Sequence, residues 1–270
     1  MKIFLVLPML LCLGIGIVSG ARAEEMGKGM FLVSPFYGNL NNESAGGSGT
    51  APLSDHGSLY GLNMLYARPN FSIGSMGHYS KLDFSTENGY LFYLTYYFQQ
   101  NKIIQPMLGF SGEYIHIFTA ENAAIAAPLN SLDVDSSIWA FHPTIGLSFK
   151  LGEQSITPFV GYFSEQVETT VVSEGMSVGG RTQNGFSSKS SVVLNYVSAG
   201  SMLDFVFHHF IRFNTKFYWR FKDGDQTRLA ARNRLDLFIS QNAGISFKYD
   251  YFDDKYEKNA FASIGPTFVF

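Results

Sequence analysis

Apolar and polar side chains alternate along much of this chain with a period of two residues. The segment 211–221 shows this most clearly: one set of alternate positions is aromatic or apolar apart from one threonine, and the other is polar and mostly basic. Because successive side chains of a β-strand point to opposite faces, a strand separates the two sets, whereas a helix would spread the charges around its circumference. The segments 139–149 and 90–98 sort in the same way. The pattern predicts strands with one apolar face.

Twelve segments of this kind divide the chain, most of them about 9 to 15 residues long, which suits tilted strands that cross a membrane. The predicted strands are 29–38, 58–67, 70–84, 89–99, 103–118, 137–150, 155–171, 189–206, 210–221, 232–241, 244–252 and 259–270. Residues 232–252 could instead form one long strand, but the turn residues at 241–244 favour a division there.

The links between these segments alternate in length. Short links lie near 67–70, 99–102, 151–154, 207–209 and 241–244, and longer polar or small-residue links lie near 39–57, 119–136, 172–188 and 222–231. Two further links, near 85–88 and 253–258, are short where the alternation calls for a long one. Short turns at one end and longer loops at the other are typical of strands that pass up and down through a membrane.

A Pro-x-x-Gly motif recurs at Pro35, Pro106, Pro143 and Pro158. Proline removes a donor from the strand ladder, and Pro106 and Pro158 fall near the start of their strands, where this loss costs least. We expect the glycines of the motif to permit bends or a close approach of neighbouring backbones. The motif is interpreted as structural.

The composition indicates a membrane fold. The chain has 26 Phe and 15 Tyr, only 15% of its residues are charged, and its mean hydropathy is +0.04. Beyond the N-terminal segment no window approaches the roughly 18 unbroken apolar residues of a spanning helix. A chain this apolar can then cross lipid only as a closed barrel, in which every backbone N–H and C=O group is paired. The sequence therefore predicts an all-β, antiparallel up-and-down transmembrane barrel of twelve strands, with ten as the alternative count.

The N-terminal segment 1–23 has the three parts of a cleaved secretion signal. A lysine at position 2 precedes an apolar stretch over 3–18, and Ala21 and Ala23 provide the small residues of a cleavage site. The stretch is shorter than the roughly 20 residues of a spanning helix, which favours cleavage over an uncleaved anchor. The predicted organisation is a signal peptide over 1–23 and one barrel domain over 24–270.

The last predicted strand ends on Phe270, and the alternate positions before it carry Phe268, Pro266, Ile264 and Ala262. An apolar face that ends in a C-terminal aromatic residue resembles the closing strand of Gram-negative outer-membrane β-barrel proteins. The resemblance implies an outer-membrane location, recognition of Ile264, Phe268 and Phe270 by the barrel-assembly machinery, and contact with the lipid bilayer and lipopolysaccharide. It covers about ten residues, and Pro266 and Val269 depart from its pattern. A secreted, soluble β-sandwich is the rival fold.

If the aromatic positions face lipid, the opposite face of the late strands lines the lumen. That face carries Arg212, Lys216, Arg220, Arg234, Asp236, Lys248 and Asp250. Five cations against two anions predict a basic stripe that would favour small anionic or polar solutes, because charged rings select ions in pores. The alternative is that arginine and aspartate side chains pair across strands and only hold the wall together.

His78 and Ser80 lie on one face of the third predicted strand. The pair resembles the His-x-Ser of outer-membrane lipid hydrolases, in which the histidine is the general base for the serine. However, Lys81-Leu82 stands where Asn-Gly commonly follows in those motifs, and the neighbouring apolar positions place the pair toward the lumen rather than the lipid. Both departures argue against catalysis.

Other candidate chemistry is sparse. The six histidines lack metal-ligand spacing, and His208-His209 fit a turn. The single cysteine, Cys12, lies inside the predicted signal, so no disulfide or cysteine ligand is expected in the mature chain. Acidic pairs at 133/135 and 223/225 are predicted in external loops. A net charge of −3 gives no reason to expect a nucleic-acid partner, and no cofactor or metal motif is present.

Three functions remain open at this point. The preferred one is a non-enzymatic, narrow porin or transporter for small polar or anionic solutes. The second is a structural or surface-interaction barrel with a plugged lumen, and the third is a lipid-facing hydrolase. Fold cannot choose between them, because function depends on the site that the fold carries.

Overall fold

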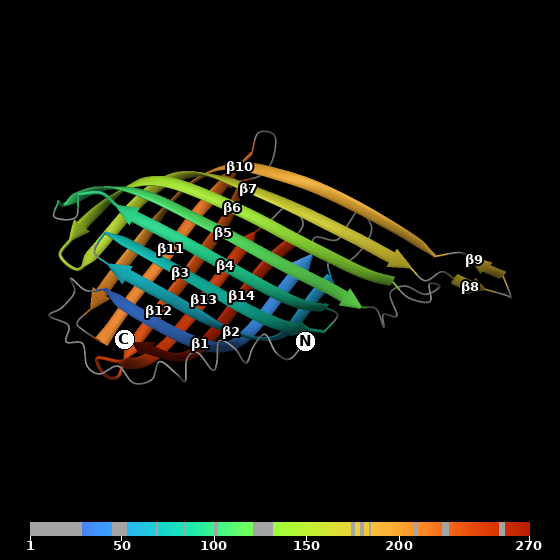
Figure 1. Ribbon diagram of the computed structural model, residues 1–270, viewed down its shortest axis with the longest axis horizontal. Helices are drawn as coiled ribbons and strands as arrows, with labels where there is room; N and C mark the ends of the chain where they lie inside the picture. The colour runs from blue at the N-terminus through green and yellow to red at the C-terminus, as the bar shows by residue number, and fades with distance from the viewer. Residues whose placement is uncertain are drawn as a thin grey trace.

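The computed structural model describes residues 29–44, 53–68, 70–83, 85–99, 102–120, 132–173, 176–178, 181–183, 185–207, 210–222, 227–253 and 257–270. Twelve antiparallel strands in these ranges close into one barrel, in the order β1-β14-β13-β12-β11-β10-β7-β6-β5-β4-β3-β2 (Figure 1). The barrel strands are β1 (Met30–Ser44), β2 (Leu53–Arg68), β3 (Phe71–Leu82), β4 (Ser85–Tyr97), β5 (Ile104–Ala120), β6 (Leu132–Leu151), β7 (Gln154–Ser173), β10 (Phe186–Phe207), β11 (Ile211–Phe221), β12 (Arg228–Phe238), β13 (Ala243–Asp253) and β14 (Glu257–Val269). Two short strands, β8 (Met176–Val178) and β9 (Arg181–Gln183), pair only with each other.

The predicted fold class and strand count are confirmed. Each predicted strand corresponds to one barrel strand, and β12 and β13 are separate, so the count of ten is wrong. The predicted ends nearest the long loops were wrong, because β1, β2 and β6 extend several residues further than the alternation indicated. Above the lipid both faces of a strand meet water, so the ladder continues where the apolar–polar alternation stops. The predicted signal, with Ala21 and Ala23, lies outside the described residues.

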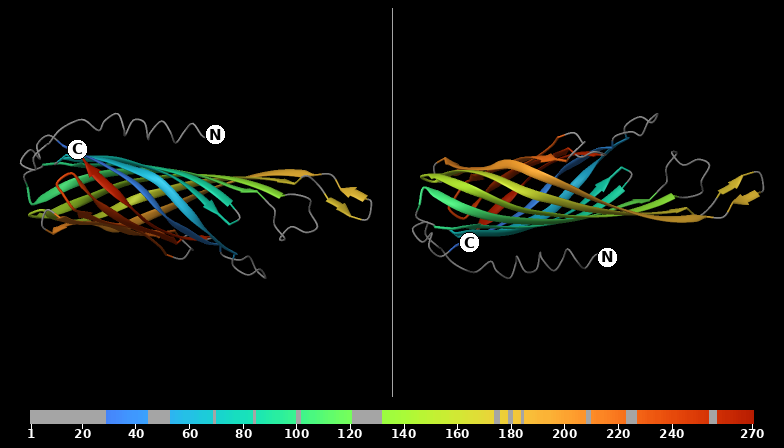
Figure 2. Two further views of the ribbon diagram at one scale, coloured as in Figure 1. Left: turned by 90° about the horizontal axis from the view of Figure 1, so that it is seen from below. Right: turned by 90° about the horizontal axis from the view of Figure 1, so that it is seen from above.

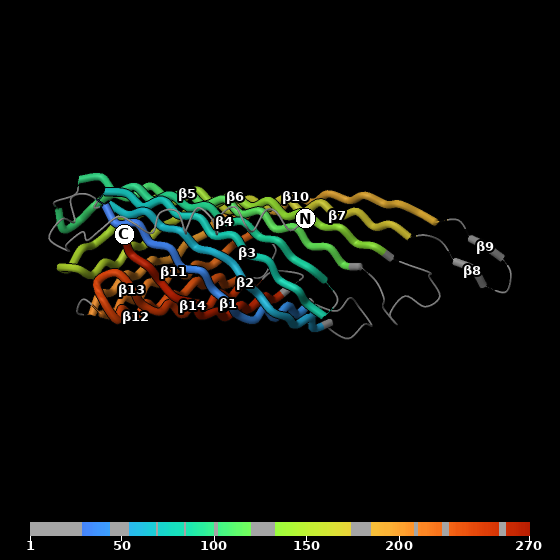
Figure 3. The backbone as a smooth tube through the Cα atoms, turned by 60° about the horizontal axis from the view of Figure 1, so that its bottom comes forward, coloured from blue at the N-terminus to red at the C-terminus, as the bar shows by residue number. Residues whose placement is uncertain are grey.

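The barrel closes between its first and last strands. The backbone N–H of Phe270 donates to the carbonyl of Phe31 at 2.8 Å, and the N–H of Phe31 donates back at 3.1 Å. At the end opposite Phe270, β7 and β10 run on beyond the rest of the wall (Figure 2). The strands are tilted, so those of the near wall cross those of the far wall obliquely (Figure 3). Tilt of this kind is required for closing a sheet into a barrel.

Aromatic rings on the outer face form rows along the two ends of the apolar wall. Tyr37, Tyr60 and Tyr79 are in register across β1, β2 and β3, with 5.2 Å between the last two ring centroids. At the other end Phe31 lies 6.5 Å from Phe270, centroid to centroid. Aromatic belts of this kind mark the two membrane–water interfaces of a spanning barrel. No helix among the described residues is long and apolar enough to cross a membrane.

The Pro-x-x-Gly motifs bring β6 and β7 close together. A Cβ added at Gly161 would lie 2.6 Å from the carbonyl oxygen of Pro143, and one added at Gly146 would lie 2.5 Å from that of Pro158. The two motifs therefore interlock, each glycine giving room to the backbone beside the other motif's proline. The close backbone approach expected from the sequence is present at both glycines.

Candidate functional site

The interior of the barrel is the candidate site, and it carries all seven charged residues that the sequence placed in the lumen. Ladder pairing sets Arg212 opposite Asp236 and Arg234 opposite Lys248, on the face away from the exposed aromatic rings. Arg220, Asp236, Lys248 and Asp250 are nearly inaccessible to solvent, each at most 9% exposed. An open aqueous pore would leave such side chains hydrated, so their burial indicates a filled interior.

The same inner face carries charges that the sequence reasoning missed. Arg228 and Arg232 lie on β12, Glu113 on β5 and Glu165 on β7. The period-two rule would have assigned all four to the interior. Arg228 was missed because its strand was predicted to begin only at residue 232. Arg232, Glu113 and Glu165 lie within predicted strands, but the sequence reasoning did not assign them to a face.

One ion pair crosses the interior from one wall to the other. The Arg232 guanidinium donates to Glu113 Oε2 at 2.8 Å, and each side chain is about one-fifth exposed. The shorter path around the barrel between their strands, β12 and β5, passes through β11, β10, β7 and β6. The pair therefore joins nearly opposite walls and cannot be a contact between neighbours in the sheet.

An apolar layer accompanies this ion pair. Met107, Phe159, Tyr218 and Ala230 form a buried cluster with contributions from β5, β7, β11 and β12, and Tyr97, Met202 and Phe252 pack against it. These side chains come from seven strands between β4 and β13, including strands that are not neighbours in the sheet, so they meet inside the barrel. We call Arg232, Glu113 and this cluster the closing layer.

A second group of polar side chains lies between β12 and β1. Arg234 Nε donates to Asp236 Oδ1 at 2.8 Å, and its Nη2 donates to Ser34 Oγ at 3.1 Å and to Ser246 Oγ at 3.0 Å. Ser246 also donates to Asp236, and both serines contact Thr267. Arg212 makes a separate bidentate pair with Asp204, at 3.0 and 2.7 Å. The charges of Arg234 and Arg212 are thus each paired with the carboxylate of an aspartate.

The lysines of the interior are held differently. The Lys248 ammonium lies 4.3 Å from the Phe36 ring centroid, and it has no hydrogen-bond partner among the described residues. Lys216 lies over two rings of the closing layer, 5.3 Å from Phe159 and 5.5 Å from Tyr218. Cation–π contacts of this kind hold a cation in place without neutralising it.

His78 and Ser80 lie inside the barrel, but they do not form a base–nucleophile pair. His78 Nε2 is 2.8 Å from Glu87 Oε1, while Ser80 is fully buried and its hydroxyl has no hydrogen-bond partner among the described residues. Ser80 is thus sealed from lipid and water alike. This geometry offers no route to the attack on a lipid that the His-x-Ser resemblance would require.

The other residues singled out in the sequence are the acidic pairs, His208-His209 and the residues of the last strand. The prediction that residues 133 and 135 lie in an external loop was wrong, because both are in β6, and Asp135 Oδ1 lies 2.9 Å from His116 Nε2. His208-His209 and the acidic pair 223/225 lie outside the described residues. Ile264, Phe268 and Phe270 all face outward and are at least 40% exposed. Within the described ranges no cluster of three or more potential ligands is placed to hold a metal ion.

Comparison with known proteins supports the fold. The translocator domain of the autotransporter NalP from Neisseria meningitidis is 11% identical, with a TM-score of 0.50 over 98% of this chain and 94% of that one. A TodX deltaS2S3 mutant monoaromatic hydrocarbon channel is 7% identical (TM-score 0.45, 89% and 90% covered), and the KdgM porin 8% (TM-score 0.43, 87% and 98% covered). No protein-family model and no curated protein matches the sequence.

The closed antiparallel wall, the outward aromatic belts and the polar, charged interior together define an outer-membrane β-barrel, and the resemblance read from the last strand agrees with this class. The likeness to the NalP domain concerns the fold alone at this level of identity. The outer face of the barrel lies in a lipid bilayer, because its apolar surface and fully paired backbone suit no other solvent.

Proposed function

We propose that the lumen of this barrel is closed to solutes at rest and that the protein acts at the cell surface. The closing layer carries this proposal, because its ion pair spans the interior between nearly opposite walls and is packed against a buried apolar cluster. The interior on the β1–β4 side is occupied as well, by a buried apolar cluster of Phe36, Leu40, Leu59, Met76, Leu82 and Leu91. The plugged-lumen reading of the sequence is therefore the better supported one.

The strands that extend beyond the wall support a role at the surface. β7 has 20 residues and β10 has 22, and the side chains of residues 186–193 are exposed on both faces of β10. β10 pairs with β7 from Phe186 onward, but its pairing with β11 begins only at Val197. A segment with no lipid-facing or core-facing side is suited to contacts outside the membrane.

A second candidate function is a narrow, gated passage for small polar or anionic solutes. It is favoured by the excess of inward cations and by Lys248, whose charge has no hydrogen-bonded anion among the described residues. Separation of Arg232 from Glu113 would leave cationic groups along the interior, and such groups select anions.

Conductance in planar bilayers tests both functions. The refolded mature chain is expected to show no stepwise conductance, and the double variant Arg232→Ser/Glu113→Ser is expected to conduct because the cross-lumen pair is gone. Glu168→Ser, which alters an exposed ion pair with Lys189 on the outer face, is the matched control and should stay closed. Steps in the wild-type protein with anion-biased reversal potentials would favour the gated passage and refute the closed barrel. Cation-biased steps would refute both.

A further inference from the structure

Two serine–histidine hydrogen bonds occur in the described part of the chain, and they lie in opposite environments. His142 Nε2 is 2.7 Å from Ser198 Oγ inside the barrel, where both residues are at most 2% exposed. Ser54 Oγ is 2.7 Å from His56 Nε2 on the outer wall, where both side chains are exposed. A serine can attack a substrate only if the substrate reaches it. The outer pair meets this condition and the inner pair does not.

The outer pair stands just beyond the aromatic belt. Ser54 and His56 share the outward face of β2 with Tyr60. The neighbouring Leu59 has the opposite parity, points inward and is buried. His56 is four residues from Tyr60, which corresponds to ~13 Å along the strand and less along the tilted membrane normal. Since belt tyrosines mark the membrane–water interface, the pair lies at the outer edge of the polar head groups, on the side of the long loops.

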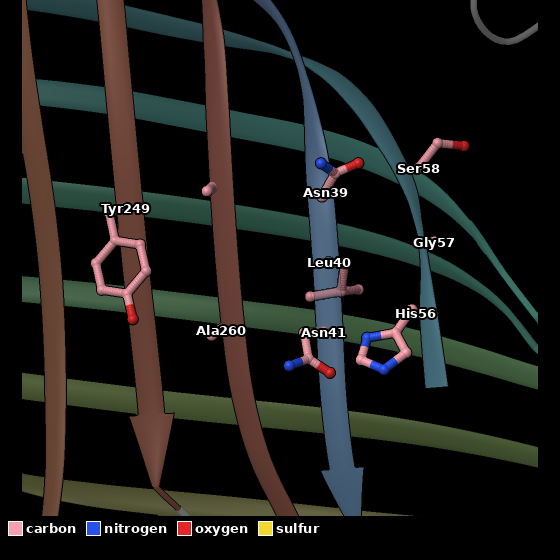
Figure 4. Close-up of a pocket in the computed structure, with 9 residues that line it drawn as sticks. Asn39, Leu40, Asn41, His56, Gly57, Ser58, Tyr249 and Ala260 are labelled. Carbon is pink, nitrogen blue, oxygen red and sulfur yellow. The ribbon is translucent and has the colours of Figure 1, made fainter. Parts of the chain in front are cut away.

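A third side chain completes the arrangement. Asn41 on β1 is the ladder partner of His56, and Figure 4 shows the two side chains side by side. If Ser54 donates its proton to Nε2, the imidazole must carry its own proton on Nδ1 and needs an acceptor there. Asn41 Oδ1 is buried and has no hydrogen-bond partner among the described residues. The Asn41 oxygen is therefore an unpaired acceptor, and it lies next to an imidazole whose Nδ1–H needs an acceptor.

His56 and Asn41 line a hollow in the outer wall, and Ser54 is hydrogen-bonded to His56. The volume of the hollow is about 630 Å³, and it is lined by Asn39, Asn41, His56, Ser58, Tyr249 and Ala260 among others (Figure 4). The hollow is of the size of ordinary ligand pockets, which are about 300–1,000 Å³. Its amide, hydroxyl and imidazole groups suit a polar head group, and the small alanine of β14 leaves room for it.

We propose that Ser54, His56 and Asn41 form a serine hydrolase site that cleaves carboxylic esters of lipids in the leaflet on the side of the long loops. His56 Nε2 takes the Ser54 proton while Oγ bonds to the ester carbonyl carbon. Collapse of that intermediate breaks the bond to the alcohol oxygen, which leaves with the proton from His56. Water then adds to the acyl-serine, passing a proton through His56 back to Ser54 Oγ, and the fatty acid is released. Asn41 holds the imidazole in the required tautomer, which makes it a positioning residue.

The first test is covalent labelling. The refolded mature chain in micelles is treated with a fluorophosphonate probe, and the modified residue is located by mass spectrometry. Labelling is expected at Ser54, and Ser54→Ala and His56→Ala should remove it. The matched controls are Ser75→Ala and His116→Ala, which are outside the hollow and should label like the wild type. Heat-modifiable gel migration checks that each variant is folded. Absence of label at Ser54 in the folded wild-type chain overturns the proposal.

Turnover supplies the second test. Release of fatty acid from phospholipid micelles should fall about 10²–10⁴-fold in His56→Ala, the range expected for loss of a general base. Asn41→Asp keeps an acceptor for the imidazole and should retain activity within tenfold, whereas Asn41→Leu should lower kcat with KM little changed. Turnover that is unaffected by Ser54→Ala, or equal in the two Asn41 variants, would contradict the assigned roles. None of these results depends on whether the lumen conducts ions.

Discussion

Removal of Arg232 or Glu113 should destabilise the barrel, and the cost should differ between the two. At 2.8 Å, two unit charges attract by about 6 kcal/mol at an effective dielectric constant of 20, and desolvation of both groups offsets much of this. Asp250 is the ladder partner of Arg232. After Glu113→Ala, Arg232 still faces that acid, so we expect a loss of ~2 kcal/mol. After Arg232→Ala, two acids face each other without their cation, so we expect ~3–4 kcal/mol.

A double-mutant cycle isolates the pair itself. Unfolding by urea in lipid vesicles can be followed through the fluorescence of Trp139 and Trp219, which are both exposed on the outer face. The coupling energy between Arg232 and Glu113 is expected to be ~1–3 kcal/mol. The control cycle uses Lys189 and Glu168, an exposed pair at 3.2 Å, for which we expect below ~0.5 kcal/mol. Equal coupling in the two cycles, or a larger loss from Glu113→Ala than from Arg232→Ala, would refute the account of the closing layer.

Three further variants probe the wall. Ile145→Arg, midway along the lipid face, should lower the free energy of unfolding in vesicles by ~2–4 kcal/mol. Ser137→Arg, nearer the rim, should lower it by only ~0–1 kcal/mol, and equal losses would contradict the assigned membrane position. Gly161→Ala should lower the free energy of unfolding by ~1–3 kcal/mol in the same assay, because its Cβ would lie 2.6 Å from a backbone carbonyl oxygen. Gly112→Ala should be tolerated, because the nearest atom to its Cβ would be 3.7 Å away. Phe270→Ala removes a ring contact worth ~0.5–1.5 kcal/mol at the closing seam, and a lower folded fraction on heat-modifiable gels is expected; an unchanged fraction would show that the seam does not need it.

Periodicity was sufficient to predict the wall of this protein. In a strand the side-chain period is two, so the sorting of 211–221 assigned one face to lipid and the other to the interior without any long-range information. The same rule placed Arg212 and Lys248 inside, and the turn at 241–244 gave the correct strand number. Each of these is a local property of a few consecutive residues, and the barrel follows because lipid demands a fully paired backbone.

Tertiary structure alone decided what the wall encloses. Arg232 and Glu113 are 119 positions apart, and their contact depends on how the closed sheet curls, which no local pattern encodes. The meeting of Asn41 with Ser54 and His56 depends on the register of β1 against β2, because a slip of one residue would turn one strand's side chains to the other face. The sequence by itself determined which residues face inward or outward, since that is a matter of alternation. Which of them touch was set by closure and register, and on those contacts depend both the closed lumen and the outer site.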